Sequence, residues 1–426
     1  MDHPMTLRLV SLGGLLFMLG VAWVLSENRR RVAWRIVVWG VTLQFVLGLI
    51  VLRSSAGRVF FEGVKACFDV LTACSEEGAR FVFGSAASLF QLDRAMVLGP
   101  DLRFAPVEPF TFSALLAFKA LPVIIFVSAM AAILQHLRVI QAVVHGIAWI
   151  MRRTMKTSGA ETFSAALQIF MGIESMSSVS GYIKTMTRSE LFTVMVTFLG
   201  SIAASVMVIY AGFGAEPGHL LAASLMSAPA GLAVAKLLVP ETGEPLTSGK
   251  LRVQIPVGSH NVFDAAAQGA SLGLQMALNV AALLIVFVGL IHLLDLTVGS
   301  LTGGTLTGIL GWLFRPLALA MGVSWHDVPK VAELLATKSV FNEFMAYEHL
   351  QPLIADHALS KRSVTVATYA LCGFANPGSI GIMIGGICAL APERRSEVAQ
   401  LSMRAFVGGT LSTFMTACVA GVLAYD

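Results

Sequence analysis

Long apolar runs recur along this chain, and eight of them approach the length that a helix needs to cross a bilayer. Such a helix takes about 20 predominantly apolar residues. The pattern therefore predicts an all-α polytopic membrane protein with eight transmembrane helices. The expected spans are Thr6–Ser26, Val32–Leu52, Ser113–Leu134, Glu190–Phe213, Leu220–Val239, Leu272–Leu294, Val364–Ile387 and Met403–Ala424.

Three other stretches place apolar residues on one helical face and charged residues off it, which is typical of helices that lie at the membrane interface. The apolar stripe of the first consists of Phe60, Val64, Cys67, Phe68 and Leu71. The second stretch is His145–Met155 and the third is Gly308–Met321.

The stretch Glu241–Asn261 is rich in Gly, Pro and polar residues and predicts a loop.

Two stretches of the chain show the same order of signals. Each has a Trp-led segment ending in Arg, a helix-start motif, a glutamate between two short apolar arms, and then Arg-Ser. Interrupted apolar segments at matching places in two halves are typical of a transporter's binding site. The first unit contains Trp149–Arg152, Ser158–Glu161, Glu174 and Arg188–Ser189, and the second contains Trp312–Arg315, Ser324–Asp327, Glu343 and Arg362–Ser363.

Each unit predicts a re-entrant hairpin. The motifs Ser158-x-x-Glu161 and Ser324-x-x-Asp327 have the spacing of a capping box, so a helix is expected to begin there and to break near the glutamate. The tip of such a hairpin exposes backbone groups, so it is buried in protein or lines a wet cavity. Two glutamates at matched positions favour a functional role over side chains that reach back to the interface.

The placement of Lys and Arg predicts the orientation. Arg29–Arg31 and Arg35 closely follow the first span, so that loop is expected in the cytoplasm and the N-terminus outside. Eight spans return the C-terminus to the outside. Three spans separate the two hairpins, so the hairpins enter from opposite sides and form an inverted repeat.

We expect a single membrane transporter domain over residues 1–426. Residues 1–112 form a scaffold of N-terminal spans and an interfacial helix. Residues 113–240 form the first repeat with its re-entrant hairpin, and residues 262–426 form the second repeat with its own.

The composition excludes several classes of protein. With 56% hydrophobic and 13% charged residues, a disordered or soluble chain is not expected. The net charge is only +4, and no basic run is interleaved with aromatic residues, so nucleic-acid binding has no support. The five cysteines show neither a CxxC motif nor the spacing of a metal site.

Each hairpin is followed by a span with a polar break. The breaks are Gly200–Ile202 and Gly373–Ser379, where Gly and Pro free backbone carbonyls inside the membrane. A glutamate nearby could accept paired hydrogen bonds from a vicinal diol or bind a cation. For Asn376 the alternative is a hydrogen bond between helices. Phe374 could stack on a flat ring, although a lone aromatic residue usually serves packing.

Several of these motifs resemble the concentrative nucleoside transporter family over nearly the whole length of the chain. The resemblance implies eight spans, two opposed hairpins and a homotrimer in the cytoplasmic (inner) membrane. It also implies symport of nucleosides with sodium or with protons, without any other cofactor or metal. The motifs are Asn342–Phe344, Cys372–Asn376, Ser189–Phe192 leading to Gly200–Ala203, and Asp264–Ala267 leading to Gln275.

The resemblance also implies roles for individual residues. Glu343, Asn376 and Ser379 would hold the ribose, with Phe374 beside the site. Ser201 and the carbonyl of Ile202 would help to bind sodium. Glu174 would take the position of the glutamate in the first hairpin.

The first hairpin tip departs from the family's pattern. The family typically has Gly-Gln-Thr-Glu-Ala-Pro, whereas this chain has Gly172-Ile173-Glu174-Ser175-Met176-Ser177. The Gln and Thr that contact the nucleobase are missing. Gln168 replaces an Asn of the sodium site, and Met171 follows it as a further ion-site residue. Base selectivity and the coupling ion, sodium or proton, therefore stay open, with Gly172 and Ile173 as substrate-site residues.

The leading interpretation is an ion-coupled symporter that imports nucleosides by alternating access. A second keeps the fold and carries a modified nucleoside or another ribosylated or polyol metabolite. A membrane-embedded enzyme is a third, but the chain has no His-Glu-x-x-His motif, no Gly-x-Ser-x-Gly motif and no His/Cys cluster, so no enzyme is expected. A passive channel fits broken helices around a central site less well.

Overall fold

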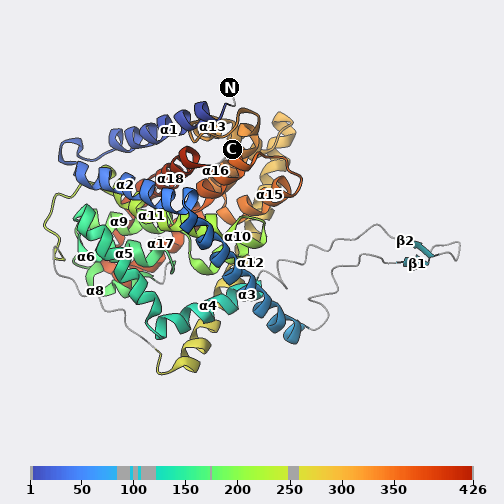
Figure 1. The fold of residues 1–426 in the computed structure, drawn as a ribbon, viewed down its shortest axis with the longest axis horizontal. Coiled ribbons are helices and arrows are strands. Elements are labelled where there is room, and N and C mark those ends of the chain that lie inside the picture. The colour runs from blue at the N-terminus through green and yellow to red at the C-terminus, as the bar shows by residue number, and fades with distance from the viewer. Residues whose placement is uncertain are drawn as a thin grey trace. The chain divides into compact units, whose positions relative to one another are not determined.

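The structure is a computed structural model that describes residues 3–83, 96–98, 104–106, 121–172, 175–247 and 259–424 (Figure 1). Its contacts fall into two compact units, which we describe separately. The first unit draws its residues from Met1–Lys65, Arg138–Val257 and Gly289–Asp426. The second draws them from Ala66–Leu137 and Gly258–Val288.

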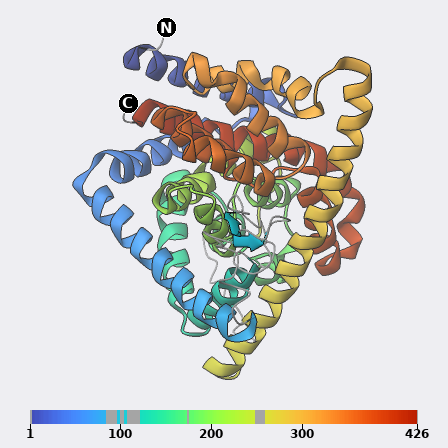
Figure 2. The same cartoon turned by 90° about the vertical axis from the view of Figure 1, so that its right-hand side faces the viewer.

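The first unit begins with two apolar helices, α1 (Pro4–Val24) and α2 (Trp34–Arg53), joined through the 3-10 turn η1 (Arg29–Arg31). Both expected N-terminal spans are therefore confirmed as helices. Proline at the first position of α1 has no N–H to leave unpaired there. Helix α1 packs against α13 (Leu306–Ala320) and α18 (Arg395–Leu423), and α1 and α13 lie side by side in both views (Figure 1, Figure 2).

The second unit contains α4 (Leu121–His136), most of α3 (Ser55–Phe83) and the first part of α12 (Val262–Thr302). Gly269 and Gly273 let α12 approach α4, because a Cβ at Gly273 would lie 2.7 Å from the Ile125 Cα. Small residues spaced by four are typical of close helix contacts in membranes. The unit also contains a short antiparallel pair of strands, β1 (Met96–Leu98) and β2 (Phe104–Pro106), which the all-α prediction did not include.

Six helical segments in the part of the chain that the structure describes are long and apolar enough to cross a membrane. They correspond to the expected first, second, fourth, fifth, sixth and eighth spans. Of the third, residues 113–120 lie outside the described residues and the rest belongs to α4. The seventh, Val364–Ile387, is not one helix. It is divided between α16 (Lys361–Leu371) and α17 (Pro377–Leu390).

The segment that the sequence predicts as the first hairpin, which we call the first hairpin below, follows helix α5 (Val139–Met155). Its first arm is α6 (Gly159–Gln168), and the predicted capping box is confirmed. The Ser158 side chain accepts from the Glu161 amide, and the Ser158 amide donates to Glu161 Oε1 at 2.8 Å. The return arm consists of two short helices, α7 (Ser175–Ser178) and α8 (Ser180–Ile183).

The segment that the sequence predicts as the second hairpin, which we call the second hairpin below, contains α14 (Val328–Val340) and α15 (Glu343–Ala355), which follow the 3-10 turn η4 (Trp325–Asp327). The predicted capping box at Ser324 is wrong. The Asp327 carboxylate instead accepts from the amide of Ser360, at 3.0 Å, and from its hydroxyl, at 2.7 Å. The side chain that was expected to cap α14 therefore joins the start of the hairpin to the start of α16.

Two helices are broken at the polar segments that the sequence indicated. Helix α9 (Arg188–Leu199) stops before α10 (Ala204–Gly212), and α16 stops before α17. Gly200 and Gly373 open these breaks. Helix α11 (Pro217–Leu238) follows α10, and the 3-10 turn η5 (Pro392–Arg394) leads into α18.

A buried lysine holds the start of the first hairpin. Lys236, 2% exposed at the end of α11, lies 2.7 Å from Glu161 Oε2 and donates to the Ser189 hydroxyl at 2.9 Å. It also pairs with Glu241 at 3.2 Å. A buried charge is tolerated when it is paired and hydrogen-bonded in this way.

A buried arginine holds the start of α16, beyond the second hairpin. The Arg362 guanidinium donates to the carbonyls of Gly322, at 2.9 Å, and Gly421, at 2.6 Å. It also donates to the hydroxyl of Ser11 in α1. We call the Lys236 and Arg362 clusters the two hairpin anchors.

Candidate functional site

Glu343 is the first residue of α15, directly after the break in the second hairpin. Asn342 caps the helix, because its side-chain oxygen accepts from the Met345 amide at 2.9 Å. The N-terminus of a helix carries partial positive charge, which stabilises a carboxylate. The break therefore places a carboxylate that is only 7% exposed where the backbone itself favours its charge.

Both oxygens of Glu343 accept hydrogen bonds from other elements. The Tyr210 hydroxyl in α10 donates to Oε1 at 3.0 Å, and the Asn376 amide donates to Oε2 at 2.8 Å. The Tyr210 ring stacks on Tyr347 with their centroids 4.4 Å apart. Tyr210 was not predicted from the sequence, although a tyrosine inside an apolar run usually finds a hydrogen-bond partner.

Asn376 also caps α17. Its side-chain oxygen accepts from the Ser379 amide at 2.8 Å while its NH₂ group donates to Glu343. The structure thus brings together Glu343, Asn376 and Ser379, all three of them buried. Phe374 lies two residues before Asn376, and its half-buried ring packs against Phe198 with the centroids 5.8 Å apart.

The two helix breaks meet. The Phe374 amide donates to the Ser201 carbonyl at 3.1 Å, and the Ala204 amide donates to the carbonyl of Phe170 in the first hairpin at 3.2 Å. The Phe374 and Ala204 amides, which the breaks leave without a helical partner, are thus each paired with another segment. The arrangement satisfies groups that the membrane interior cannot hydrate.

One predicted ion-site residue, Ile202, is bonded to a serine hydroxyl of α11. Ser224 in α11 donates to the carbonyls of Ile169, at 3.3 Å, and Ile202, at 3.5 Å. Gln168 is fully buried and its amide nitrogen donates to the Val194 carbonyl at 3.2 Å. Its Oε1 atom has no hydrogen-bond donor among the residues that the structure describes. An unpartnered buried oxygen is an acceptor available to a cation.

The tip of the first hairpin is described only in part. Gly172 is buried, and its carbonyl accepts from the Ser175 amide and hydroxyl, at 3.2 and 2.7 Å. Met171 is half-buried, with its amide bonded to the Leu167 carbonyl. Ile173 and Glu174, two of the predicted substrate-site residues, lie outside the described residues.

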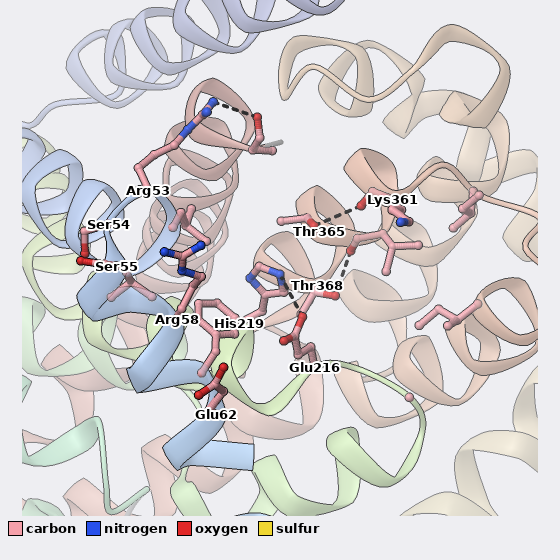
Figure 3. Close-up of a pocket in the computed structure, with 18 of the residues that line it drawn as sticks. Arg53, Ser54, Ser55, Arg58, Glu62, Glu216, His219, Lys361, Thr365 and Thr368 are labelled. Atoms are coloured by element: carbon pink, nitrogen blue, oxygen red, sulfur yellow. Dashed lines mark hydrogen bonds and ion pairs between the residues drawn. The ribbon is translucent and has the colours of Figure 1, made fainter. Parts of the chain in front are cut away.

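A large cavity lies elsewhere in the first unit, and the sequence did not indicate it. It has a volume of about 920 Å³ and none of the predicted site residues line it. Figure 3 shows Arg53, Arg58 and Lys361 around it, with Glu216 close to His219. His219 Nε2 is 3.4 Å from Glu216 Oε2, and burial raises the pKa of the Glu216 carboxyl.

Comparison with protein families gives three matches that together cover most of the chain. Residues 13–86 match "Na+ dependent nucleoside transporter N-terminus" and residues 219–421 match "Na+ dependent nucleoside transporter C-terminus". Residues 117–217, between them, match "Nucleoside recognition".

Individual relatives cover almost all of this chain. Mouse "Solute carrier family 28 member 3" is 39% identical over an alignment of 437 positions, which covers 98% of this chain and 59% of the relative. Rat "Sodium/nucleoside cotransporter 1" is 36% identical, and the match covers 64% of it. The chain thus spans about three fifths of these mammalian relatives. "Uncharacterized transporter YutK" of Bacillus subtilis is 38% identical over 96% of this chain and 98% of its own.

Solved structures share the whole fold. CNTnw in an inward-facing substrate-bound state has a TM-score of 0.89 at 38% identity, covering 97% of this chain and 98% of that one. A CNTnw variant in an outward-facing state also has a TM-score of 0.89, at 36% identity. These relatives are transporters and not enzymes. The fold is that of an all-α, multi-pass membrane transporter, and the chain belongs to the concentrative nucleoside transporter family.

Proposed function

We propose that this protein is a sodium-coupled symporter that imports nucleosides across the cytoplasmic membrane by alternating access. The observation that carries the proposal is the Glu343 carboxylate, held by Tyr210 and Asn376 where the second hairpin meets a broken helix. A carboxylate and an amide at this place can pair with the two hydroxyl groups of a ribose. Relatives named as sodium/nucleoside cotransporters support the same cargo.

The ribose site consists, in this proposal, of Glu343, Asn376 and Ser379. The existing bonds from Tyr210 and Asn376 orient the carboxylate. A ribose hydroxyl would donate to a remaining lone pair of Glu343, because an ionised carboxylate has about four acceptor positions. Phe374 lies beside this group, and Gly172, Ile173 and Glu174 of the first hairpin complete the base side.

The ion site consists, in this proposal, of Gln168, Met171, Ser201 and Ile202. Sodium is a hard cation that prefers oxygen ligands, as calcium and magnesium do. The free Oε1 of Gln168 and the backbone oxygens near the break in the first half supply such ligands. The Ser201 carbonyl accepts from the Phe374 amide. A single hydrogen bond therefore joins the break that would hold the ion to the segment that carries Phe374 and Asn376.

The proposed topology has eight crossings, two hairpins entering from opposite sides, both termini outside, and three copies in the assembly. The polar break after each hairpin supports the repeat. Relatives solved in inward-facing and outward-facing states support alternating access. Labelling of single introduced cysteines from each side of the membrane tests the orientation. The mass of the purified protein, after subtraction of the bound detergent, tests the trimer.

Transport is tested with purified protein in liposomes. Radiolabelled uridine and adenosine are offered with an inward sodium gradient, an inward proton gradient, or neither. We expect uptake that depends on sodium. Uptake of neither nucleoside under either gradient contradicts the proposed function, and uptake driven only by protons contradicts the proposed ion. Competition by ribosylated and polyol compounds then defines the cargo.

A further inference from the structure

A lysine side chain lies fully buried near the end of α14, in the first arm of the second hairpin. Lys338 has no exposed surface. Its ammonium group donates to the Ala370 carbonyl at 2.7 Å and to the Thr413 hydroxyl at 3.0 Å. It also lies 5.7 Å from the centre of the Phe414 ring. An ionisable group inside the membrane region is costly, so its retention points to function.

The Ala370 carbonyl is available because α16 is broken. In a continuous helix this oxygen would accept from the amide of Phe374. That amide donates instead to Ser201, across the meeting point of the two breaks. The Lys338 ammonium replaces the missing donor. Because the C-terminal end of a helix carries partial negative charge, a cation there is favoured over a neutral donor.

The first half has a neutral side chain at the end of its own first arm, bonded to a carbonyl of the helix that breaks at Gly200. Gln168, near the end of α6, donates to the Val194 carbonyl of α9 and leaves its own oxygen without a donor among the described residues. The Ser201 amide is bonded to Phe198, which releases the Thr197 carbonyl from its helical partner. Thr197 precedes Gly200 by as many residues as Ala370 precedes Gly373. The first half thus offers the oxygens of Gln168 and Thr197. In the second half, the Lys338 ammonium is already bonded to the Ala370 carbonyl.

We propose that the Lys338 ammonium is the built-in cation of the second half. It holds the end of α16 and the turn that presents Asn376 to Glu343, so that this half needs no dissolved ion, whereas the first half takes up sodium. The inference rests on the proposed function. Lys338 is a positioning residue, since it contacts α16 and α18 and not the ribose site itself.

The experiment measures uridine binding to the purified full-length protein by calorimetry over a series of sodium concentrations. The variant Lys338→Ala removes the charge and leaves room for a small cation. The matched control is Lys330→Ala, because Lys330 belongs to the same helix and also donates to a carbonyl, that of Ala358 at 2.9 Å, but is exposed.

We expect Lys338→Ala to weaken uridine binding by about tenfold or more, which corresponds to loss of one charged hydrogen-bonded contact. Its sodium dependence should become steeper than that of the wild type, because a second cation is now needed. Added methylammonium should restore binding and the wild-type sodium dependence, whereas tetramethylammonium, which cannot donate, should not. Lys330→Ala should match the wild type.

Two results would overturn the inference. One is uridine binding by Lys338→Ala at wild-type strength. The other is weakened binding with an unchanged sodium curve and no response to methylammonium, which would make the lysine a packing residue. If Lys338→Ala does not fold, Lys338→Gln takes its place, because glutamine keeps a donor without the charge. Its uridine binding should also depend more steeply on sodium than that of the wild type, and an unchanged dependence would overturn the inference. A wild-type protein that binds no nucleoside contradicts the proposed function instead.

Discussion

The backbone amide of Phe374 donates to the backbone carbonyl of Ser201 at 3.1 Å, which joins the break in α16–α17 to the break in α9–α10. Glycines allow this approach. A Cβ on Gly373 would overlap the Thr413 methyl group and lie 3.2 Å from the Leu199 carbonyl. Each of these two groups takes the place of the helical partner that the other has lost. A change in one break is therefore expected to alter the other.

The first prediction concerns Gly200, which opens the break in the first half. A Cβ here would overlap the Ser412 hydroxyl oxygen. We expect Gly200→Ala to destabilise the protein by about 1–3 kcal/mol, the usual cost of overpacking. Thermal unfolding in detergent measures this.

A second substitution identifies the cause. Ser412→Ala removes the overlapping oxygen, so the double variant should recover most of the lost stability. Gly381→Ala is the control, since nothing lies within 4 Å of a Cβ there. Equal instability of the single and double variants would show that the clash is not with Ser412.

The second prediction concerns the charge of Glu343. Glu343→Gln replaces one of the two acceptor oxygens by an NH₂ group, which then faces the donor of either Tyr210 or Asn376. A hydrogen bond to a charged group contributes about 1.5–3 kcal/mol, so weaker binding of the ribose should lower uridine uptake about tenfold to hundredfold. Folded protein, judged by gel filtration, should change little. The exposed residue of the same helix gives the control, Glu348→Gln, which should transport normally. Wild-type uptake by Glu343→Gln would refute the role of the carboxylate.

The third prediction concerns the free oxygen of Gln168. Gln168→Met keeps the length of the side chain but removes the oxygen, so half-maximal uptake should need about tenfold more sodium. Gln168→Asn, which restores the residue type that the family has, should strengthen the sodium dependence. Uptake curves over a sodium series measure both. An unchanged sodium response in both variants would exclude Gln168 from the ion site.

The fourth prediction concerns the buried pair of Lys236 and Glu161. Lys236→Met leaves the Glu161 carboxylate, 1% exposed, without its cation. Loss of one partner of a buried ion pair costs about 3–5 kcal/mol, so the unfolding temperature should drop sharply. The double variant, with Lys236→Met and Glu161→Gln, should recover part of the lost unfolding temperature. Lys184→Met breaks an exposed pair with Glu393 and should have almost no effect. A small effect of Lys236→Met would mean that water reaches the pair.

Much of the fold could be predicted from the sequence because membrane helices obey simple rules of length and composition. Gly and Pro also marked the interruptions at Gly200 and Gly373 correctly, since these residues leave the helical ladder incomplete. The capping motif at Ser158 was reliable because both partners lie in one turn. The motif at Ser324 failed because a distant residue, Ser360, competes for the Asp327 carboxylate.

The partners within the site were harder to predict. Glu343 and Asn376 stood out because polar residues in apolar segments are rare. Tyr210, Ser224 and Lys338 did not, because their roles depend on which helix lies opposite. A periodicity argument treats each helix alone and cannot supply that pairing. The cavity around Arg53 and Lys361 has the same origin, since its walls come from segments far apart in the chain.

The two hairpin anchors have a mechanical consequence. Lys236 ties the start of the first hairpin to the end of α11, and Arg362 ties the start of α16 to α1 and α18. Lys236 therefore fixes the end of the first hairpin that lies away from its tip, and Arg362 fixes the segment that follows the second hairpin. Buried charges thus hold the starts of α6 and α16, whereas two uncharged side chains, Tyr210 and Asn376, hold the Glu343 carboxylate at the break of the second hairpin.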